Sequence, residues 1–219
     1  MARRKLDHYK FSEQAENVVQ AGKPLYSEVK GNWNKRYFNN ESPIVVELAC
    51  GKGEYTVGLG KKFPHKNFIG VDIKGDRIAR GSAMAMEHNL SNVAFLRAGI
   101  QYSDEFFGDG ELSEIWLIHP DPQVRDRNEK YRLTNPSFLA KYATFLKQEG
   151  MFFLKTDSDF LYEYTLQTIG ETSNFRIIDH TYDLYQSHLL DEHHGVRTHY
   201  EGIFTAKGYT IKYIKAQLV

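Results

Sequence analysis

The feature that most constrains this fold is a short apolar strand that runs directly into a glycine-rich turn. Residues 44–49 form the strand, with Glu47 as its only charged member, and Gly51-Lys52-Gly53 form the turn. A second, mostly apolar strand follows at residues 67–72 and ends in Asp72. A strand, a glycine turn, a helix and a strand ending in an acid together form the arrangement that holds an adenosine-bearing cofactor at the carboxyl edge of a parallel sheet.

Beyond this unit, apolar segments of strand length alternate with segments of helical spacing. The sequence predicts seven strands, at residues 44–49, 67–72, 93–96, 114–118, 151–155, 175–178 and 209–214. It predicts four main helices, at residues 54–63, 74–89, 135–147 and 158–170. Such alternation indicates a doubly wound α/β fold with a mostly parallel sheet, in which ligands bind at the carboxyl ends of the strands.

The first 40 residues differ from the rest of the chain. They are polar and rich in aromatic side chains, with turn signals at residues 31–34 and 39–40. A length of 219 residues favours a single folded domain. We therefore expect residues 1–40 to form a basic N-terminal arm and a strap that packs on a domain of residues 41–219.

Composition excludes several classes of protein. The longest apolar runs contain only a few residues, so no membrane-spanning segment is expected. The basic residues at positions 3–5 are not followed by the apolar region of a secretory signal. The single cysteine, Cys50, cannot form an intrachain disulfide and fits a reducing, cytoplasmic setting.

Charge is locally concentrated although the formal net charge is zero. The chain has 28 basic and 28 acidic residues, which argues against a uniformly basic surface. Binding of nucleic acid remains open because it depends on where the charges lie. Two basic clusters stand out, each compatible with a solvated surface as well as with phosphate contacts. They are Arg3, Arg4, Lys5 and Lys10 near the N-terminus, and Arg125, Arg127, Lys130 and Arg132 in the middle.

The strand at residues 114–118 ends in His119-Pro120-Asp121-Pro122. A proline restricts its own backbone and that of the residue before it, so Asp121 is restricted from both sides. An isolated Pro-Asp-Pro is also compatible with a rigid turn and a solvated carboxylate. At the end of this strand, however, the same stiffness would hold the carboxylate at the lip of the cofactor crevice.

Four sequence motifs resemble those of the bacterial tRNA (guanine-N7)-methyltransferase family, whose members are class I S-adenosylmethionine-dependent enzymes. The motifs are Glu47 to Gly53, Pro120-Asp121-Pro122 with Arg132-Leu133-Thr134, Lys155-Thr156-Asp157, and Thr198-His199-Tyr200-Glu201. They follow the family's order and cover roughly residues 40–215. The resemblance implies a seven-stranded sheet with an antiparallel last strand. It also implies methylation of N7 of guanine 46 in the tRNA variable loop, with S-adenosyl-L-methionine as cofactor, tRNA as partner and no obligatory protein partner.

The same resemblance assigns roles to individual residues. Glu47 and Gly51-Lys52-Gly53 would cradle the methionine and ribose parts of the cofactor, and Asp72 would accept hydrogen bonds from the ribose hydroxyls. Asp121 matches the catalytic aspartate, which faces the transferred methyl group. The positions that match the substrate-binding residues are Arg125, Asp157, Thr198 and Glu201.

The chain departs from the family pattern at four positions. Gly99 stands where the family has an acidic residue that reads the adenine amino group, so either adenine recognition passes to backbone groups near residues 100–101 or cofactor affinity is weaker. Ala49 replaces the first glycine of the turn. Gln123 replaces a tryptophan, and Arg125 replaces a lysine with retention of charge but a different contact geometry.

The chemistry of the reaction supports carboxylates in this site. Guanine N7 carries an in-plane lone pair and is unprotonated at neutral pH, so a general base is unnecessary. Positive charge moves onto the guanine during transfer, and nearby carboxylates can stabilise it. Carboxylates also accept hydrogen bonds from guanine N1–H and N2–H₂. We therefore expect Asp121, Asp157 and Glu201 to orient the base and stabilise charge.

Several alternatives remain open from sequence alone. A nicotinamide-dependent dehydrogenase would share the strand-turn-acid arrangement, and a catalytically silent RNA-binding module would explain Gly99 and Gln123. The target guanine must be exposed or flipped, and Tyr102 and Tyr131 are compatible with stacking or with packing. A metal site is not expected. The four histidines considered for one, His188, His193, His194 and His199, lack a known ligand spacing.

Overall fold

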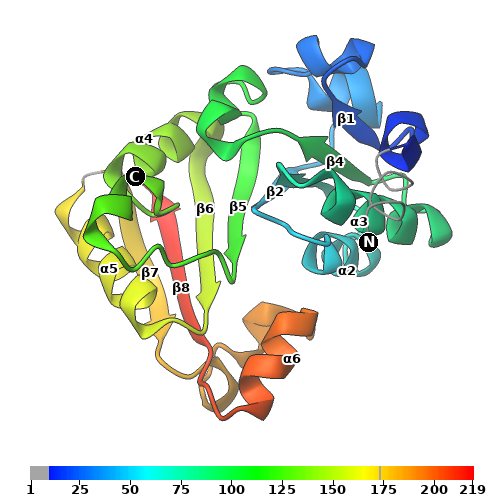
Figure 1. Ribbon diagram of the computed structural model, residues 1–219. Helices are drawn as coiled ribbons and strands as arrows, with labels where there is room; N and C mark the ends of the chain where they lie inside the picture. The colour runs from blue at the N-terminus through cyan, green and yellow to red at the C-terminus, as the bar shows by residue number, and fades with distance from the viewer. Residues whose placement is uncertain (1–9, 173) are drawn as a thin grey trace.

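The computed structural model describes residues 10–172 and 174–219. Arg3, Arg4 and Lys5 lie outside the described residues. The described chain is built on one sheet of eight strands in the order β1-β4-β3-β2-β5-β6-β8-β7 (Figure 1). The strands are β1 (Val18–Gln20), β2 (Ile44–Leu48), β3 (Asn67–Asp72), β4 (Val93–Arg97), β5 (Leu112–Ile118), β6 (Leu146–Thr156), β7 (Phe175–Thr181) and β8 (Lys212–Leu218). The α-helices are α2 (Glu54–Lys62), α3 (Gly75–Glu87), α4 (Pro136–Phe145), α5 (Asp159–Glu171) and α6 (His199–Ala206).

The order of the strands reverses at β2. This strand pairs in parallel with β3 on one side and with β5 on the other, and the chain runs outward from β3 to β4 before it returns to β5. Such a reversal opens a crevice at the carboxyl ends of the central strands. β8 is antiparallel to both β6 and β7. The mostly parallel α/β sheet with an antiparallel last strand is therefore confirmed, but it has eight strands where seven were predicted.

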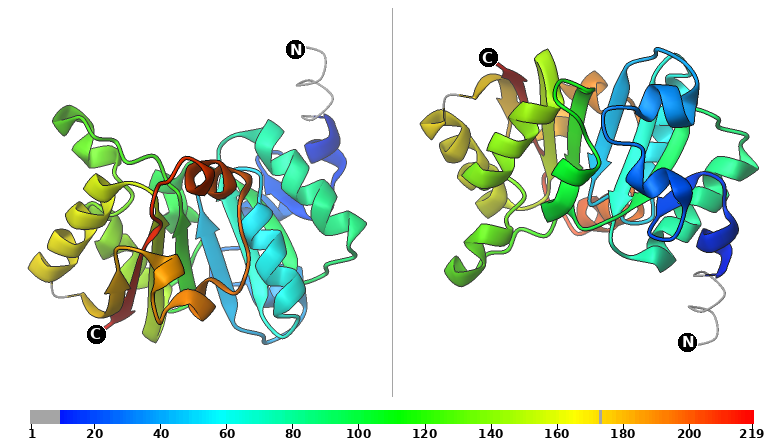
Figure 2. Two further views of the ribbon diagram at one scale, coloured as in Figure 1. Left: turned by 90° about the horizontal axis from the view of Figure 1, so that it is seen from below. Right: turned by 90° about the horizontal axis from the view of Figure 1, so that it is seen from above.

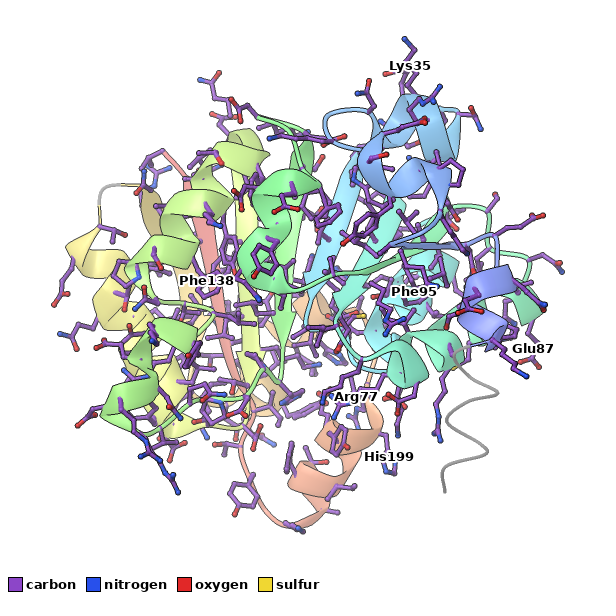
Figure 3. The ribbon with its side chains drawn as sticks, turned by 45° about the horizontal axis from the view of Figure 1, so that its top comes forward. Lys35, Arg77, Glu87, Phe95, Phe138 and His199 are labelled. Carbon is purple, nitrogen blue, oxygen red and sulfur yellow. The ribbon has the colours of Figure 1, made fainter. Side chains whose placement is uncertain are left out.

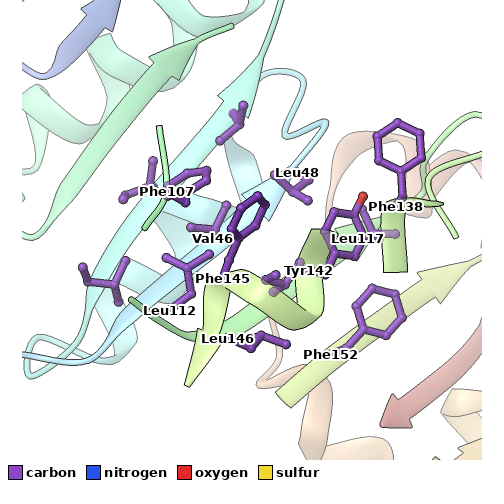
Figure 4. Close-up of a cluster of buried hydrophobic side chains, with 14 of the residues drawn as sticks. Val46, Leu48, Phe107, Leu112, Leu117, Phe138, Tyr142, Phe145, Leu146 and Phe152 are labelled. Carbon is purple, nitrogen blue, oxygen red and sulfur yellow. The ribbon is translucent and has the colours of Figure 1, made fainter. Parts of the chain in front are cut away.

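Helices cover both faces of the sheet (Figure 2). Because side chains alternate along a strand, Ile115 and Leu117 of β5 join one buried cluster whereas Trp116 and Ile118 join the other. The first cluster includes residues of α4 (Figure 4) and of α5. The second includes residues of α2 and α3. Burial on both faces explains why the central strands read as nearly continuous apolar runs.

The N-terminal segment adds a strand that the sequence did not predict. Val18–Gln20 pairs in parallel with Phe95–Arg97 at the edge of the sheet. Nearby, Trp33 is fully buried, and its indole Nε1 donates to the backbone oxygen of Phe106 at 2.9 Å. Three residues are too few to show an alternating pattern, so only the pairing with β4 identifies β1 as a strand.

The C-terminal region also differs from the prediction. Helix α6 was not predicted from the sequence, and the last strand begins at Lys212 rather than at residue 209. Ile211 is apolar and buried but precedes the strand, so its apolar side chain extended the predicted strand toward the N-terminus. The missed signal for α6 is Thr198 followed three residues later by Glu201, because these residues form a capping box at the start of the helix.

Candidate active site

The predicted site residues gather at the carboxyl ends of the central strands. α6 lies beyond these strand ends (Figures 1 and 2). Figure 3 shows Arg77, in the first turn of α3, close to His199, the first residue of α6. The start of α3 and the start of α6, which are far apart in the sequence, therefore lie close together at the end of the sheet, where the crevice is expected.

Two adjoining cavities occupy this position, and Ala49 lines both of them. The larger has a volume of about 470 Å³ and is lined by Ala49, Asp72, Ile73, Ala98, Gly99, Ile100, Gln101, Lys130, Tyr131, Leu133 and Phe138. The smaller has a volume of about 100 Å³ and is lined by Glu47, Ala49, Cys50, Gly51, Lys52, Glu54, Arg77, Ile118, His119, Thr198 and Tyr200. The predicted cofactor residues are divided between the two cavities. Only Asp121 and Gly53 line neither.

The turn after β2 adopts a left-handed backbone. Ala49, Gly51 and Gly53 have φ angles of 60°, 56° and 67°. A Cβ atom at Gly53 would lie 2.5 Å from the ring of Phe95, so a side chain does not fit there. Gly51 faces open space, which leaves its backbone accessible to a ligand. At Ala49 the left-handed conformation costs roughly 1 kcal/mol, so the missing glycine places strain in this turn.

Two carboxylates hold the ends of the turn. Asp72 accepts from the backbone N–H of Gly51 at 3.0 Å through Oδ2, and from that of Lys74 at 2.7 Å through Oδ1. Glu47 accepts from the backbone N–H of Thr56 at 2.8 Å and also from its hydroxyl. Burial raises the pKa of Glu47 to about 8. Glu47 is therefore largely protonated at neutral pH, whereas Asp72 anchors the glycine turn to β3.

Gln101 occupies the space next to Gly99. A Cβ atom at Gly99 would lie 2.8 Å from both the Nε2 and the Oε1 atoms of Gln101. Both residues line the larger cavity. Within residues 10–172 and 174–219, the side-chain amide of Gln101 has no hydrogen-bond partner. The Gln101 amide, which can both donate and accept hydrogen bonds, therefore lies next to Gly99, the position where the family has an acidic residue.

Four charged residues form a cluster at the ends of β5 and β6, here called the buried charge cluster: His119, Lys155, Asp157 and Glu201. Lys155 and Glu201 are fully buried, and Lys155 Nζ lies 2.8 Å from Glu201 Oε1. His119 Nδ1 lies 3.1 Å from Asp157 Oδ1, and His119 Nε2 lies 3.7 Å from Glu201 Oε2. The cluster thus joins β5, β6 and α6 through charged side chains.

Within this cluster, the shifted pKa values favour the ionised carboxylate of Glu201 and the protonated imidazole of His119. Burial acts to raise the pKa of Glu201, but hydrogen bonds and charges from His119 and Lys155 lower it to about 2. Burial acts to lower the pKa of His119, but the hydrogen bond to Asp157 and the nearby Glu201 carboxylate raise it above its usual value. Burial lowers the pKa of Lys155, against the attraction of Glu201.

Glu201 has little capacity left for another ligand. Its Oε1 accepts from the Tyr185 hydroxyl at 2.5 Å as well as from Lys155, and its Oε2 accepts from the backbone N–H of Thr198 at 3.4 Å. Asp157 is different: its side chain is 24% exposed, and its Oδ2 has no partner among the described residues. Of these two predicted guanosine-binding carboxylates, Asp157 is the one with a free acceptor.

Asp121 lies in an exposed loop directly after β5. Its Oδ1 accepts from the backbone N–H of Gln123 at 3.0 Å, and Gln123 has a φ of 47°. This short turn fixes the direction of the carboxylate while leaving Oδ2 open. Arg125, the fourth predicted substrate residue, is exposed further along the same loop.

Arg132 corrects one prediction about the basic clusters. We expected its guanidinium on the surface, but only 4% of the residue is exposed. The guanidinium lies over the neighbouring rings of Phe160 and Tyr164, 4.7 Å and 4.5 Å from their centroids, and Nε donates to the backbone oxygen of Gln123 at 3.2 Å. Arg132 therefore supports the Asp121 loop from inside the protein.

Three exposed tyrosines lie at or near this edge of the sheet, and two of them line a cavity. Tyr102 and Tyr131, which the sequence left open between stacking and packing, are 54% and 57% exposed. Tyr131 lies on the wall of the larger cavity, with Lys130 Nζ 5.2 Å from its ring centroid. Tyr200, on the wall of the smaller cavity, is 51% exposed. These rings are available to stack on a flat ligand.

The histidines considered for a metal site point to separate partners. His188 pairs with Asp179, and the backbone N–H of His199 donates to Glu54. In the described part of the chain, no three His, Cys, Asp or Glu side chains are placed to hold a metal ion together. No helix in these residues is long and apolar enough to cross a membrane.

Sequence reasoning missed three functional candidates. His119 was passed over because a histidine before a proline has no known pattern. Gln101 was considered only for its backbone, and Tyr185 lies in a segment without clear periodicity. The only sequence signal for His119 was its position at the end of the strand next to the predicted crevice.

Comparison with known proteins adds evidence from sequence. A family model described as "Putative methyltransferase" matches residues 41–214. A protein named tRNA (guanine-N(7)-)-methyltransferase from Cytophaga hutchinsonii is 40% identical over 220 residues, which cover 100% of this chain and 99% of that protein. One of the same name from Bacteroides fragilis is 47% identical over 188 residues, which cover 86% of this chain and 73% of that protein.

Comparison with solved structures supports the fold. The 16S rRNA methyltransferase KamB superposes with a TM-score of 0.64 at 13% identity, covering 84% of this chain and 91% of that chain. A 30S ribosomal A1408 methyltransferase from an uncultured bacterium superposes with a TM-score of 0.60 at 16% identity, covering 92% of this chain and 98% of that chain. At these identities the likeness shows a shared class I methyltransferase fold and nothing finer.

Proposed function

This chain belongs to the tRNA (guanine-N(7)-)-methyltransferase family, and we propose that it transfers a methyl group from S-adenosyl-L-methionine to N7 of guanine 46 in the variable loop of tRNA. One observation carries the proposal beyond family membership. The two cavities that hold the predicted cofactor residues share Ala49 in their walls, and the smaller one is also walled by His119 and by Thr198 and Tyr200 at the start of α6. The cofactor site thus borders residues of the predicted guanine site.

The residues of the two cavities suit S-adenosylmethionine. Asp72, at the wall of the larger cavity, offers carboxylate oxygens to a ribose, and Gln101 offers an amide to an adenine. Lys52 and Arg77 face the smaller cavity together with Glu47 and Glu54. The two cations suit the carboxylate of a methionine, and the Glu54 carboxylate suits its ammonium group. When bound, the cofactor supplies a methyl group bonded to a positively charged sulfur.

On the guanine side, the residues orient the base and stabilise charge. Asp157 has a free Oδ2 to accept from guanine N1–H or N2–H₂, which adenine cannot match. Asp121 places a second open carboxylate oxygen in the exposed loop, where it can stabilise the positive charge that develops on the base. Glu201, whose oxygens are already engaged, supports the site through Lys155 and His119 (distances given above). Most of the rate gain is then expected from alignment of N7 with the methyl carbon.

For tRNA binding, exposed basic side chains surround the site. Arg125, Arg127 and Lys130 are exposed on the loop that carries Asp121. Phosphate contacts of this kind make affinity fall steeply as salt rises. With tRNA as its partner, the protein would act in the cytoplasm.

The test is methyl transfer to an unmodified tRNA transcript, with labelled S-adenosylmethionine and chemical cleavage at N7-methylguanosine. We expect one new cleavage product, at guanine 46, and none in a transcript in which adenine replaces that guanine. Methylation at another guanine would reject the position but keep the activity. Binding of tRNA without any methylation would instead favour the silent RNA-binding module.

The dehydrogenase alternative is tested by titration calorimetry. We expect binding of S-adenosylmethionine and S-adenosylhomocysteine, but none of NAD at the same concentrations. Tight NAD binding with no response to S-adenosylmethionine would reject the cofactor assignment.

A further inference from the structure

His119 combines three unusual properties. It has a φ of 47°, and such left-handed backbone is uncommon outside glycine, although asparagine, aspartate and histidine adopt it more often than other residues. Its side chain is only 6% exposed. Its backbone N–H donates to the oxygen of Lys155 at 2.8 Å, so the strained residue is tied to the end of β6. Strain of this kind persists only where surrounding contacts require it.

Both ring nitrogens of His119 face carboxylate oxygens. Nδ1 lies 3.1 Å from Asp157 Oδ1, and Nε2 lies 3.7 Å from Glu201 Oε2. A neutral imidazole has one N–H, so one of its nitrogens would place a lone pair opposite an acceptor. In an imidazolium both nitrogens carry a proton, so Nδ1 donates to Asp157, and the proton on Nε2, which is buried without a hydrogen-bond partner among the described residues, faces Glu201 at ion-pair distance. The imidazolium also balances the charges, because Asp157 and Glu201 are then matched by His119 and Lys155.

We propose that His119 is a positioning residue which, as an imidazolium, holds the Asp121 loop against Asp157 and α6, so that methyl transfer depends on its proton. The inference rests on the proposed function. His119 is followed directly by Pro120 and Asp121, and the proline restricts the backbone between them. Any shift of the imidazole is therefore passed to the Asp121 carboxylate.

The charged surroundings of His119 favour this protonation state. The groups that face it from the elements packed around it are Asp157 and Lys155 of the β6 end, Glu201 of α6, and Lys212 of β8, which donates to the Asp157 backbone oxygen at 3.2 Å. The smaller cavity, which it lines, adds Glu47, Glu54, Lys52 and Arg77. The two carboxylates are the nearest of these groups, and they raise the pKa of His119 above its usual value despite burial.

The proposal predicts a fall in the rate of methyl transfer at alkaline pH. As pH rises through the raised pKa of His119, the imidazolium is lost and the Asp121 loop is released. The single-turnover rate with saturating tRNA should fall on the order of tenfold to a hundredfold, as expected when a reacting group is misplaced by about 1 Å. The affinity for S-adenosylmethionine, measured by calorimetry at the same pH values, should change much less.

His119→Asn is the diagnostic variant, because asparagine tolerates the left-handed backbone but carries no charge. We expect it to lose the same factor in rate at neutral pH, and to lose the alkaline fall. His88→Asn is the matched control, since His88 is exposed at the end of α3, and it should leave rate and pH profile unchanged. Glu47, which has a pKa of about 8, remains in both variants, so any fall that persists in His119→Asn belongs to another group.

An NMR titration of histidine-labelled protein tests the charge state without reference to activity. We expect the His119 signal, identified by its absence from the His119→Asn spectrum, to titrate above pH 6.5. If the variant does not fold, proximity to Asp157 and Glu201 identifies the signal in the wild-type spectrum. The proposal is rejected if His119 is neutral at pH 7, or if the wild-type rate does not fall at alkaline pH. A wild-type protein that methylates no tRNA at any pH would reject the proposed function instead.

Discussion

The cofactor half of the site, around Ala49–Gly53, Asp72 and Gln101, and the guanine half, around Asp121 and the buried charge cluster, are held together by different interactions. In the cofactor half, carboxylates accept from backbone N–H groups within one strand-helix-strand unit. In the guanine half, charged side chains from three distant segments pair with each other.

This difference has consequences for robustness. A backbone-held turn loses little when a single exposed side chain is changed, because the N–H groups remain in place. A cluster of buried charges depends on each member, because removal of one partner leaves another charge buried without compensation. We therefore expect the guanine half to be sensitive in both stability and activity, and the cofactor half to be sensitive mainly in affinity.

The largest effect is expected from Lys155→Met. It removes the nearest cation of the fully buried Glu201 and should lower the free energy of unfolding by about 3–5 kcal/mol. Chemical denaturation measures the loss. The double variant Lys155→Met with Glu201→Gln removes the stranded charge and should recover a large part of the stability. If the two single losses simply add, the two side chains are not coupled.

Glu201 should make the free energy of unfolding decrease at acid pH. Its pKa is about 2 in the folded protein and near 4.5 when unfolded. Its contribution is therefore fully present above about pH 4.5, and it is lost as pH falls toward 2, in total roughly 3 kcal/mol. Denaturation from pH 6 to 3 should show the loss in the wild type and a weaker one in Glu201→Gln. Equal slopes in both proteins would contradict the assignment.

Asp121→Asn separates activity from stability within the guanine half. Asp121 is exposed, and an asparagine Oδ1 still accepts from Gln123, so the free energy of unfolding should change by less than about 0.5 kcal/mol. Loss of the negative charge should lower the methyl-transfer rate on the order of a hundredfold. Asp126→Asn, exposed on the same loop, is the control and should be nearly silent. Wild-type rates in Asp121→Asn would refute its catalytic role.

The smallest effect is expected in the cofactor half. Gln101→Ala removes the amide beside Gly99 and should weaken S-adenosylmethionine binding about five- to tenfold, the loss of one hydrogen bond. Calorimetry measures the affinity, while the KM for tRNA should stay the same. Gln148→Ala, exposed on β6, is the matched control. If the affinity of Gln101→Ala is unchanged, the Gln101 side chain does not recognise adenine, and the backbone groups near residues 100–101 are the remaining candidates.

How far the sequence predicted this molecule depended on the range of the interactions involved. The central strands and helices α2 to α5 were located within a few residues, because each is long enough to show its own periodicity. β1 was missed because three residues show no pattern, and α6 because its capping box was read only as a binding motif. Arg132 was predicted on the surface because a run of basic residues does not reveal that one of them packs over two aromatic rings.

By itself, the sequence determined the α/β class, the glycine turn with its acidic partner Asp72, and the set of residues that resemble the methyltransferase family. These features are local, since propensity, spacing and motif all act within a few tens of residues. Only the tertiary structure decided that Glu201 is enclosed by Lys155, Tyr185 and His119, and that Gln101 fills the space at Gly99. The energy of a buried charge depends on which distant groups surround it, and that is settled only when β5, β6 and α6 meet.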